Sequence, residues 1–447
     1  MYLQWLQIVA VDSQLGTSEY RRRGIMRTVA WGAMAKVVAL CSSLLMVSLA
    51  MRYLGTEDYG LWVAVSSMMA LLGFLDGGFG NAIVNVVAYS SAQRNEQQLK
   101  RIVSSAVLVL LAVSSLGLLA FLYLQPKVPW AWLFGLTISR GAINALVLVI
   151  GIGFFVMMVV SVVSRVQRGL QLGHLDAIAV AVGGLFSLIL AGAAIALDAG
   201  LIGFAVAGVA GPILAQLVNA GIFLFRRPSL RPSVASFDVD IARQLARAGG
   251  MFFVLQLTSL VQLYADNLIL AHWLGPAAVA PYDVCMKLFL IVPFFAALVA
   301  TPLWPAYREA LASGDAGWIR RSFRRHLGYS LAAGLPFALA LAWLAPLVIP
   351  WWTGTSLMLS PALVLGCMVW SVMLLLGSVL SALLNGLQQV RLQVIVASVA
   401  GMVNVGISIP LVLSHGIVGA VWGSVIAYGG CALLPYLWWV PRILRRL

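Results

Sequence analysis

Two long apolar runs near the start of the chain, Val29–Met51 and Leu61–Val87, constrain its fold more than any other feature. A short polar corner, residues 52–60, separates them. Each run exceeds the roughly 20 residues that a helix needs to cross the hydrocarbon core of a bilayer. The pair therefore predicts two membrane-spanning helices that run in opposite directions and meet at a tight turn.

Each of these runs carries an isolated charge, Lys36 in the first and Asp76 in the second. A charge that faces lipid costs from about 2.5 to more than 10 kcal/mol, so both side chains are expected to face protein or a water-filled cavity. Measured along the helices from one membrane face, both lie about 12 Å deep, which makes them candidate neighbours. Two interpretations stay open: a buried ion pair that holds the helices together, or a substrate path lined by Lys36, with Asp76 in ion coupling or gating.

The composition of the whole chain is that of a membrane protein. Of its 447 residues, 62% are hydrophobic and only 9% are charged, whereas soluble domains contain about 25% charged residues. The net charge of +14 would suit nucleic-acid binding, but Lys and Arg fall mostly between the apolar runs, where they determine membrane topology. The four cysteines lie inside apolar runs, with neither disulfide nor metal spacing. We therefore expect an all-α polytopic membrane protein that binds no nucleic acid.

The apolar runs predict twelve transmembrane helices, six in each half of the chain. Nearly all Lys and Arg residues fall in the loops and tails on one side, so the positive-inside rule places both termini in the cytoplasm. The opposite loops are short and hold only Arg52, Lys127 and, if the fourth span starts after it, Arg140. Whether Trp130–Gly141 extends the fourth span or lies along the interface stays open. The predicted spans are 29–51, 61–87, 102–124, 143–164, 176–197 and 201–225, then 250–271, 279–305, 327–349, 359–384, 392–413 and 416–440.

The two halves of the chain repeat each other. At a nearly constant spacing, three motifs of the first half return in the second: Arg52-Tyr53-Leu54-Gly55 as His272-Trp273-Leu274-Gly275, Gly169-Leu170-Gln171 as Gly386-Leu387-Gln388, and Gly200-Leu201-Ile202-Gly203 as Gly416-Ile417-Val418-Gly419. Because each half has an even number of spans, both halves enter from the same side, as in the parallel repeats of alternating-access carriers. The expected parts are a cytoplasmic N-terminal tail at 1–27, an N-lobe at 28–225, a cytoplasmic linker at 226–249, a C-lobe at 250–441 and a cytoplasmic tail at 442–447.

The second half has intramembrane charges of its own. Asp266 lies near the outer end of the seventh span, and Asp283 and Lys287 lie four residues apart on one face of the eighth. We expect the three to form one cluster. The alternatives are a structural salt-bridge network, a site for a coupling ion, gating or substrate, and, for Asp283, simple snorkelling to the interface.

Three further polar residues are candidates for substrate contact. Arg140 would add a cation near the outer face, or would only anchor a helix at the interface. Asn81 and Asn85 share a face at the inner end of the second span, where they could meet a sugar or bond another helix.

The sequence lacks the signatures of an enzyme. Gly77-Gly78-Phe79-Gly80 fits neither a dinucleotide loop nor a P-loop, and the four histidines have no metal spacing. No outer loop is long enough to fold into a catalytic domain. We expect a protein that is not an enzyme and needs no cofactor or metal, with H+ or Na+ as the candidate coupling ion.

The polar corner and the residues after it resemble a known family. Tyr53–Trp62 followed by Leu75–Ala82 is similar to the start of polysaccharide-biosynthesis flippases, the O-antigen-type exporters of the multidrug/oligosaccharidyl-lipid/polysaccharide superfamily. Asn267–Leu270 with Leu274-Gly275, and Pro302–Tyr307, resemble the family's seventh and eighth spans. The similarity of layout covers nearly the whole chain, whereas these distinctive motifs cover only a small part of it.

The resemblance implies a bacterial inner-membrane protein whose two six-helix lobes form a V. It implies that an undecaprenyl-diphosphate-linked oligosaccharide moves from the cytoplasmic to the periplasmic leaflet, driven by an ion gradient. A polysaccharide polymerase and a chain-length regulator would be the partners. The cationic lumen described for the family would make Lys36, Arg140 and Lys287 the partners of the diphosphate. Twelve spans argue against the peptidoglycan-precursor branch, whose members usually have more.

Other functions stay open. A multidrug or metabolite cation antiporter would share the fold, but such carriers usually rely on a carboxylate in the first span, where this chain has Lys36. Asp266 and Asp283 keep that function open, because they could bind a proton or a sodium ion. A membrane enzyme acting on the same lipids is disfavoured by the short outer loops, and a non-transporting scaffold is the last alternative.

Overall fold

The structure, a computed structural model, describes residues 18–93, 95–135, 140–357 and 359–446, although some side chains in these ranges, that of Arg140 among them, lie outside the description. Within these ranges the chain folds into helices joined by short connections and has no β-strand, as predicted for an all-α membrane protein. The helices are α2 (Ser18–Leu71), η1 (Leu72–Asp76), α3 (Phe79–Ala92), α4 (Glu96–Leu124), η2 (Gln125–Lys127), α5 (Trp130–Leu133), α6 (Arg140–Val160), α7 (Val162–Gly169), α8 (Gly173–Ala196), α9 (Gly200–Arg226), η3 (Pro228–Leu230), η4 (Val234–Ser236), α10 (Val239–Leu274), α11 (Pro276–Phe289), α12 (Ile291–Ala312), α13 (Ala316–Thr353), α14 (Pro361–Gly386), α15 (Val390–His415), α16 (Ile417–Tyr428), η5 (Gly429–Leu433) and α17 (Leu434–Arg446).

Within the described part of the chain, ten helices are long and apolar enough to cross a membrane. The first, Trp31–Asp76, has 46 residues, which at 1.5 Å per residue is about 69 Å and enough for two passes. It turns back at Gly55, where φ is 75° and ψ is −176°. The 36-residue helix α10 covers the predicted span 250–271. The helices are therefore consistent with the twelve predicted spans.

The predicted internal repeat is present in the backbone itself. Each repeated motif contains one residue with a positive φ, and the two members of each pair have nearly the same value. Glycine adopts such a φ freely, but glutamine rarely does, so its presence in both halves is a specific structural match. The φ values are 75° and 87° at Gly55 and Gly275, 62° and 60° at Gln171 and Gln388, and 61° and 62° at Gly200 and Gly416.

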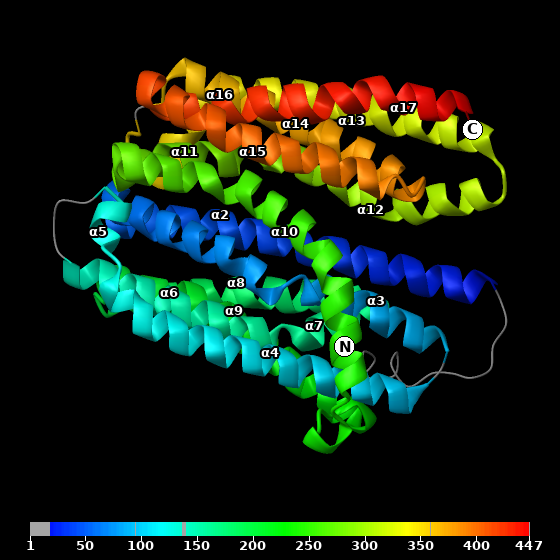
Figure 1. Cartoon of the computed structure of the whole chain (residues 1–447). Helices are drawn as coiled ribbons and strands as arrows, with labels where there is room; N and C mark the ends of the chain where they lie inside the picture. The colour runs from blue at the N-terminus through cyan, green and yellow to red at the C-terminus, as the bar shows by residue number, and fades with distance from the viewer. Residues whose placement is uncertain (1–17, 94, 136–139, 358, 447) are drawn as a thin grey trace.

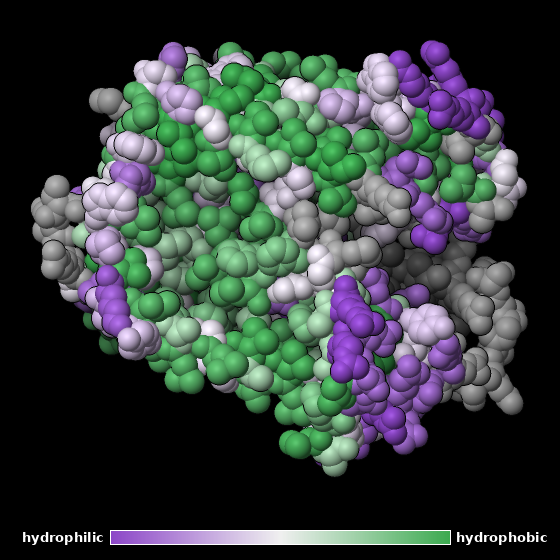
Figure 2. All heavy atoms as spheres, viewed as in Figure 1, coloured by the Kyte–Doolittle hydropathy of each residue, from purple (hydrophilic) through white to green (hydrophobic). Residues whose placement is uncertain are grey.

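Two groups of helices make up the molecule (Figure 1). One group contains α2 to α9 and the other α11 to α17, and α10 crosses from the first group to the second. We call the end with Gly55, α5 and the start of α11 the predicted outer end, and the opposite end the predicted inner end. Figure 2 shows a broad hydrophobic surface between hydrophilic residues gathered at the two ends, as expected for helices that cross a bilayer.

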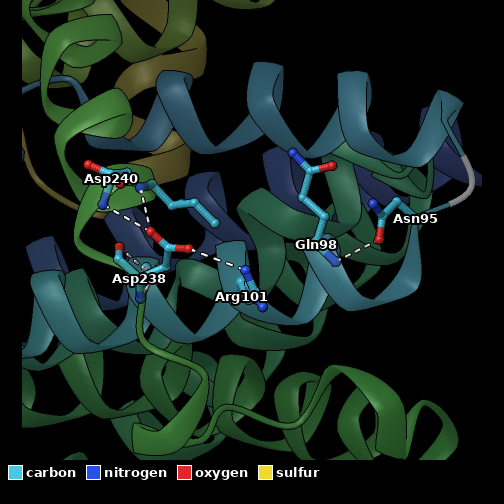
Figure 3. Close-up of polar contacts among 7 residues, drawn as sticks. Asn95, Gln98, Arg101, Asp238 and Asp240 are labelled. Atoms are coloured by element: carbon cyan, nitrogen blue, oxygen red, sulfur yellow. Dashed lines mark hydrogen bonds and ion pairs between the residues drawn. The ribbon is translucent and has the colours of Figure 1, made fainter.

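The stretch expected as a linker, 226–249, is partly helical. α10 begins at Val239, and the carboxylate of Asp238 caps it by accepting hydrogen bonds from the backbone N–H groups of Asp240 (2.9 Å) and Ile241 (3.2 Å). Arg101 of α4 lies 3.6 Å from the same carboxylate (Figure 3). The first part of α10 runs across the neighbouring helices in Figure 1, so its start is held against the first group of helices.

In the undecided stretch Trp130–Gly141, the described residues include parts of two separate helices, so its first part is not a simple extension of the fourth span. Its first residues make the short helix α5, which is separate from α6. Trp130 and Phe134 are buried, and the Trp130 indole donates a hydrogen bond of 2.8 Å to the carbonyl oxygen of Gln125. Residues 136–139 lie outside the described part of the chain.

Small residues let the helices approach closely. A methyl group added at Gly419 would overlap the backbone carbonyl of Leu411, and one added at Gly423 would overlap Ser408. The same holds between the two groups of helices, where a methyl group at Gly60 of α2 would overlap the carbonyl oxygen of Pro276 in α11. Gly60 is therefore a point of direct backbone contact at the predicted outer end.

We predict that Gly60→Ala destabilises the protein. The new methyl group meets a backbone carbonyl that cannot rotate away, so α2 and α11 must separate, and overpacking of this kind costs about 1–3 kcal/mol. Thermal unfolding of the purified protein should show a melting temperature lower by several degrees.

The matched control is Gly192→Ala, because no atom lies within 4 Å of a methyl group placed there. Alanine is favoured over glycine inside a helix by about 1 kcal/mol, so this variant should keep or raise the melting temperature. Equal melting temperatures for the two variants would contradict the tight contact at Gly60.

Candidate functional site

A cluster of two buried side chains and a partly exposed lysine joins the two groups of helices at the predicted outer end. On α11, Lys287 Nζ lies 2.8 Å from Asp283 Oδ2, so the pair predicted from the four-residue spacing is formed. Tyr59 of α2 donates its hydroxyl to the same carboxylate, and Lys287 Nζ donates to the Tyr59 oxygen at 3.3 Å. We call Tyr59, Asp283 and Lys287 the outer cluster. Asp283 is buried, which excludes snorkelling to the interface.

Hydrogen bonds to main-chain oxygens also join the two groups of helices at the predicted outer end. Arg52 donates to the carbonyl oxygen of Trp351 at 2.9 Å, and Ser48 donates to that of Trp352 at 2.6 Å. In return, the Trp352 indole donates to the carbonyl oxygen of Leu44 at 2.9 Å. These bonds tie α2 to the end of α13, so the two groups of helices are closed against each other at the predicted outer end.

A second polar cluster surrounds the buried side chain of Asp266, a residue of α10. Its Oδ2 accepts hydrogen bonds from Tyr282 (2.8 Å) and Ser424 (2.6 Å), and Asn404 donates to Ser424 at 2.7 Å. Ser408 lies close enough to interact with the carboxylate, although its hydroxyl makes no well-formed hydrogen bond. We call Asp266, Tyr282, Asn404, Ser408 and Ser424 the aspartate cluster.

Three oxygens of the aspartate cluster have no hydrogen-bond partner among the described residues. They are Oδ1 of Asp266, Oδ1 of Asn404 and Oγ of Ser408. Buried polar atoms are nearly always paired, so several unpaired oxygens in one place need an explanation. Oxygen atoms of carboxylate, amide and hydroxyl groups are ligands suited to a hard cation or to a proton.

The prediction that Asp266, Asp283 and Lys287 form one cluster is wrong. Consecutive residues on a helix point in different directions, and Tyr282 turns towards Asp266 while its neighbour Asp283 turns towards Tyr59. The result is two clusters, one inside the second group of helices and one between the groups.

Asp76 pairs with Arg165 and not with the predicted neighbour Lys36. The Arg165 guanidinium lies 3.1 Å from Asp76 Oδ2, and the backbone N–H of Gly78 donates to Asp76 Oδ1 at 2.8 Å. These contacts stabilise the interruption of the helix between η1 and α3, where Gly77 and Gly78 both have positive φ. Depth along a helix gives the height of a residue in the membrane but not the direction of its side chain, which is why the pairing was wrong.

The remaining predicted residues lie at the surface or outside the description. Lys36 is exposed on α2 and forms no ion pair with any described residue. Asn81 and Asn85 are both exposed on α3. Arg140 is the first residue of α6, but its side chain lies outside the described part of the structure. Their roles in binding stay predictions.

Sequence reasoning missed Tyr59 in the outer cluster and every member of the aspartate cluster except Asp266. Tyr59 and Arg165 are far from their partners in the sequence and belong to other helices, so no local pattern indicated them. Asn404 and Ser408 could have been found, because they are polar residues four apart within an apolar span and therefore share a face. Among the described residues, no group of three or more His, Cys, Asp or Glu side chains could hold a metal ion.

Known proteins match this chain in sequence and in fold. The model of a family described as polysaccharide biosynthesis protein matches residues 25–310. A putative O-antigen export protein of Yersinia pseudotuberculosis is 21% identical over 300 residues, which are 64% of this chain. The match spans 65% of the length of that relative.

Two solved structures show the same fold. An inward-facing multidrug resistance MATE family transporter of the MOP superfamily superposes with a TM-score of 0.72, at 17% identity over 93% of this chain and 99% of that one. The lipid II flippase MurJ in an inward closed conformation gives a TM-score of 0.69, at 15% identity over 92% of this chain and 87% of that one. At these identities the likeness shows the fold alone. The family model, however, covers well over half of the sequence, and the chain therefore belongs to the polysaccharide biosynthesis protein family.

Proposed function

We propose that the protein is a flippase that moves an undecaprenyl-diphosphate-linked oligosaccharide from the cytoplasmic to the periplasmic leaflet by alternating access. The observation that carries this proposal is the family match over residues 25–310 on a fold shared with MOP superfamily transporters. The putative O-antigen export protein that the chain resembles supports a substrate of the same class.

The physical problem is to carry a diphosphate and its sugars through hydrocarbon. An uncompensated charge in that environment is very costly, so the path must supply cations and polar groups. The exposed cation Lys36 on α2 is one group available for this task. Lys287 is the other, although in this structure it is bound within the outer cluster.

The outer cluster suggests how the outer side opens. Because Tyr59 belongs to the first group of helices and Asp283 to the second, separation of the groups breaks the bond between them. Lys287 then loses the Tyr59 oxygen but keeps its ion pair with Asp283 on the same helix, so one of its three N–H donors becomes available to the diphosphate. In this proposal the cluster is a gate whose lysine exchanges a protein partner for substrate phosphate. Arg140 would add a further cation at the predicted outer end.

The aspartate cluster is the best candidate for ion coupling. Asp266 Oδ1, Asn404 Oδ1 and Ser408 Oγ are three unpaired oxygens around one buried carboxylate. A sodium ion held by these oxygens would satisfy all three, whereas a proton on Asp266 would satisfy Oδ1 and supply one hydrogen bond to a neighbouring oxygen. Binding and release of the ion would then change how α10, α15 and α16 pack against one another, because these helices carry the residues.

A cation antiporter is the second candidate function, because the fold is also that of MATE family transporters. A buried carboxylate such as Asp266 would serve either function. An export assay with lipid-linked sugars distinguishes the two, because only the flippase changes their leaflet.

We predict that cells with the protein place labelled lipid-linked oligosaccharides in the periplasmic leaflet and that Lys36→Ala largely abolishes this. Loss of one charge-assisted contact to phosphate is worth about 1.5–3 kcal/mol, so transport should fall about 10- to 100-fold. The measurement is the labelled sugar accessible on each leaflet, with protein insertion checked separately.

The control for this prediction is Lys127→Ala, which removes an exposed lysine that lies over the ring of Tyr123. It should transport at the wild-type rate. Wild-type transport by Lys36→Ala would remove Lys36 from the substrate path, and an unchanged leaflet distribution with the intact protein would refute the flippase itself.

Asp266→Asn should alter the ion dependence of transport more than substrate binding. The amide cannot bind a proton and holds a cation less well, so the rate should no longer respond to the sodium or the proton gradient. The measurement is transport during titrations of sodium and pH, with Asp176→Asn, a residue paired with Arg168 at 3.6 Å, as the control. Titration curves identical to those of the wild type would rule out Asp266 as the coupling site.

The proposed orientation places both termini in the cytoplasm of a bacterial inner membrane. Reporter domains fused after Gln125 and after Arg231 should therefore respond as outside and inside, respectively. The opposite pattern would invert the proposed direction of transport.

A further inference from the structure

The first turns of α10 carry a polar groove of about 540 Å³ that the mechanism above does not use. Asp240, Arg243, Gln244, Arg247 and Ala248 line it. These positions recur at intervals of three and four residues and so share one face of the helix. We call this face the arginine face. Figure 2 shows a hydrophilic strip that borders the hydrophobic surface in this region.

The arginine face is built to accept an anion. Arg243 is 3.1 Å from Asp240, but both side chains are largely exposed, so their ion pair is weak and an anionic ligand can displace it. Arg247 forms no ion pair with any described residue. Guanidinium groups match phosphate oxygens two at a time, which makes arginine better suited than lysine to bind phosphate groups.

The opposite face of the same turns is fixed to the protein. Leu245 is fully buried, and the Asp238 backbone N–H donates a hydrogen bond of 3.0 Å to Ser105. The backbone of Gly249 packs directly on Gly78. A methyl group added at Gly78 would overlap the carbonyl oxygen of Gly249. The two arginines are therefore held on a rigid support and are not carried by a free loop.

The location of the arginine face favours a lipid-borne ligand. The cap of α10 at Asp238 lies beside Arg101, close to the start of α4 and hence near the predicted inner membrane surface (Figure 3). Charged residues at this height meet the headgroups of the inner leaflet. A lipid diphosphate presents two linked phosphates, and two arginines one helical turn apart lie about 6 Å from each other, which suits such a pair.

We propose that the arginine face is the entry site that captures the diphosphate of the lipid-linked substrate in the inner leaflet before its sugars pass between the helix groups. This inference rests on the proposed flippase function. It assigns substrate recognition to Arg243 and Arg247, at the start of the helix that carries Asp266 further along.

The test measures binding of undecaprenyl diphosphate to the purified full-length protein in nanodiscs of neutral lipid. The double variant R243Q/R247Q should bind at least tenfold more weakly than the wild type. The charge-matched control R445Q/R446Q, which removes two exposed arginines from the end of α17, should stay within about twofold of it. The variant R243K/R247K keeps both charges but loses the bidentate geometry, so it should bind more tightly than R243Q/R247Q and more weakly than the wild type, and this partial recovery would exclude a folding defect.

Competing lipids distinguish a substrate site from a general anionic-lipid site. Phosphatidylglycerol and undecaprenyl monophosphate should compete at least tenfold more weakly than undecaprenyl diphosphate. Equal competition by phosphatidylglycerol, or wild-type affinity in R243Q/R247Q, would overturn the entry site while leaving the flippase function intact. A wild-type protein that transports no lipid-linked sugar would instead overturn the proposed function on which the inference rests.

Discussion

The structure depends on one constraint: an ionised or polar side chain inside a bilayer must find its partner within the protein. Asp76 meets it through Arg165, and Asp283 meets it through Lys287 and Tyr59. These paired groups hold helices together. The exceptions are the exposed Lys36 and the unpaired oxygens around Asp266, and to these we assign binding in the proposed function. Pairing thus distinguishes the charges that hold helices together from those without a partner, and in our proposal Lys287 serves both purposes.

The two halves share a frame but not a polar interior. Equivalent residues turn the backbone in the same way in both halves, as at Gln171 and Gln388. Inside the first half, however, the buried amide network is internally paired: Ser164 donates to Gln216 at 2.6 Å, and Gln167 and Asn219 exchange hydrogen bonds of 2.9 and 3.0 Å. The aspartate cluster in the second half leaves oxygens unpaired. Divergence within a symmetric frame is what makes the second half the candidate for ion binding.

α10 connects the regions to which we assign function. It begins at the arginine face, packs through Gly249 on the break between η1 and α3, and continues to Asp266. The next residue, Asn267, donates a hydrogen bond of 2.9 Å to Ser67 of α2. In our proposals α10 contacts the substrate at one end and carries the ion site near the other, which gives the two events a common element to bias, as coupled transport requires.

The sequence by itself determined the membrane class, the approximate spans and the internal repeat, because these depend only on how each segment meets water or lipid. It also predicted the Asp283–Lys287 pair, since two residues four apart on one helix are neighbours wherever the helix lies. Only the tertiary structure decided that Asp76 meets Arg165, that Tyr59 completes the outer cluster, and that Asn404, Ser408 and Ser424 surround Asp266. Such contacts depend on how each helix is rotated about its axis and which helix lies beside it. Both follow from the packing of all helices together, and no single stretch of sequence contains that information.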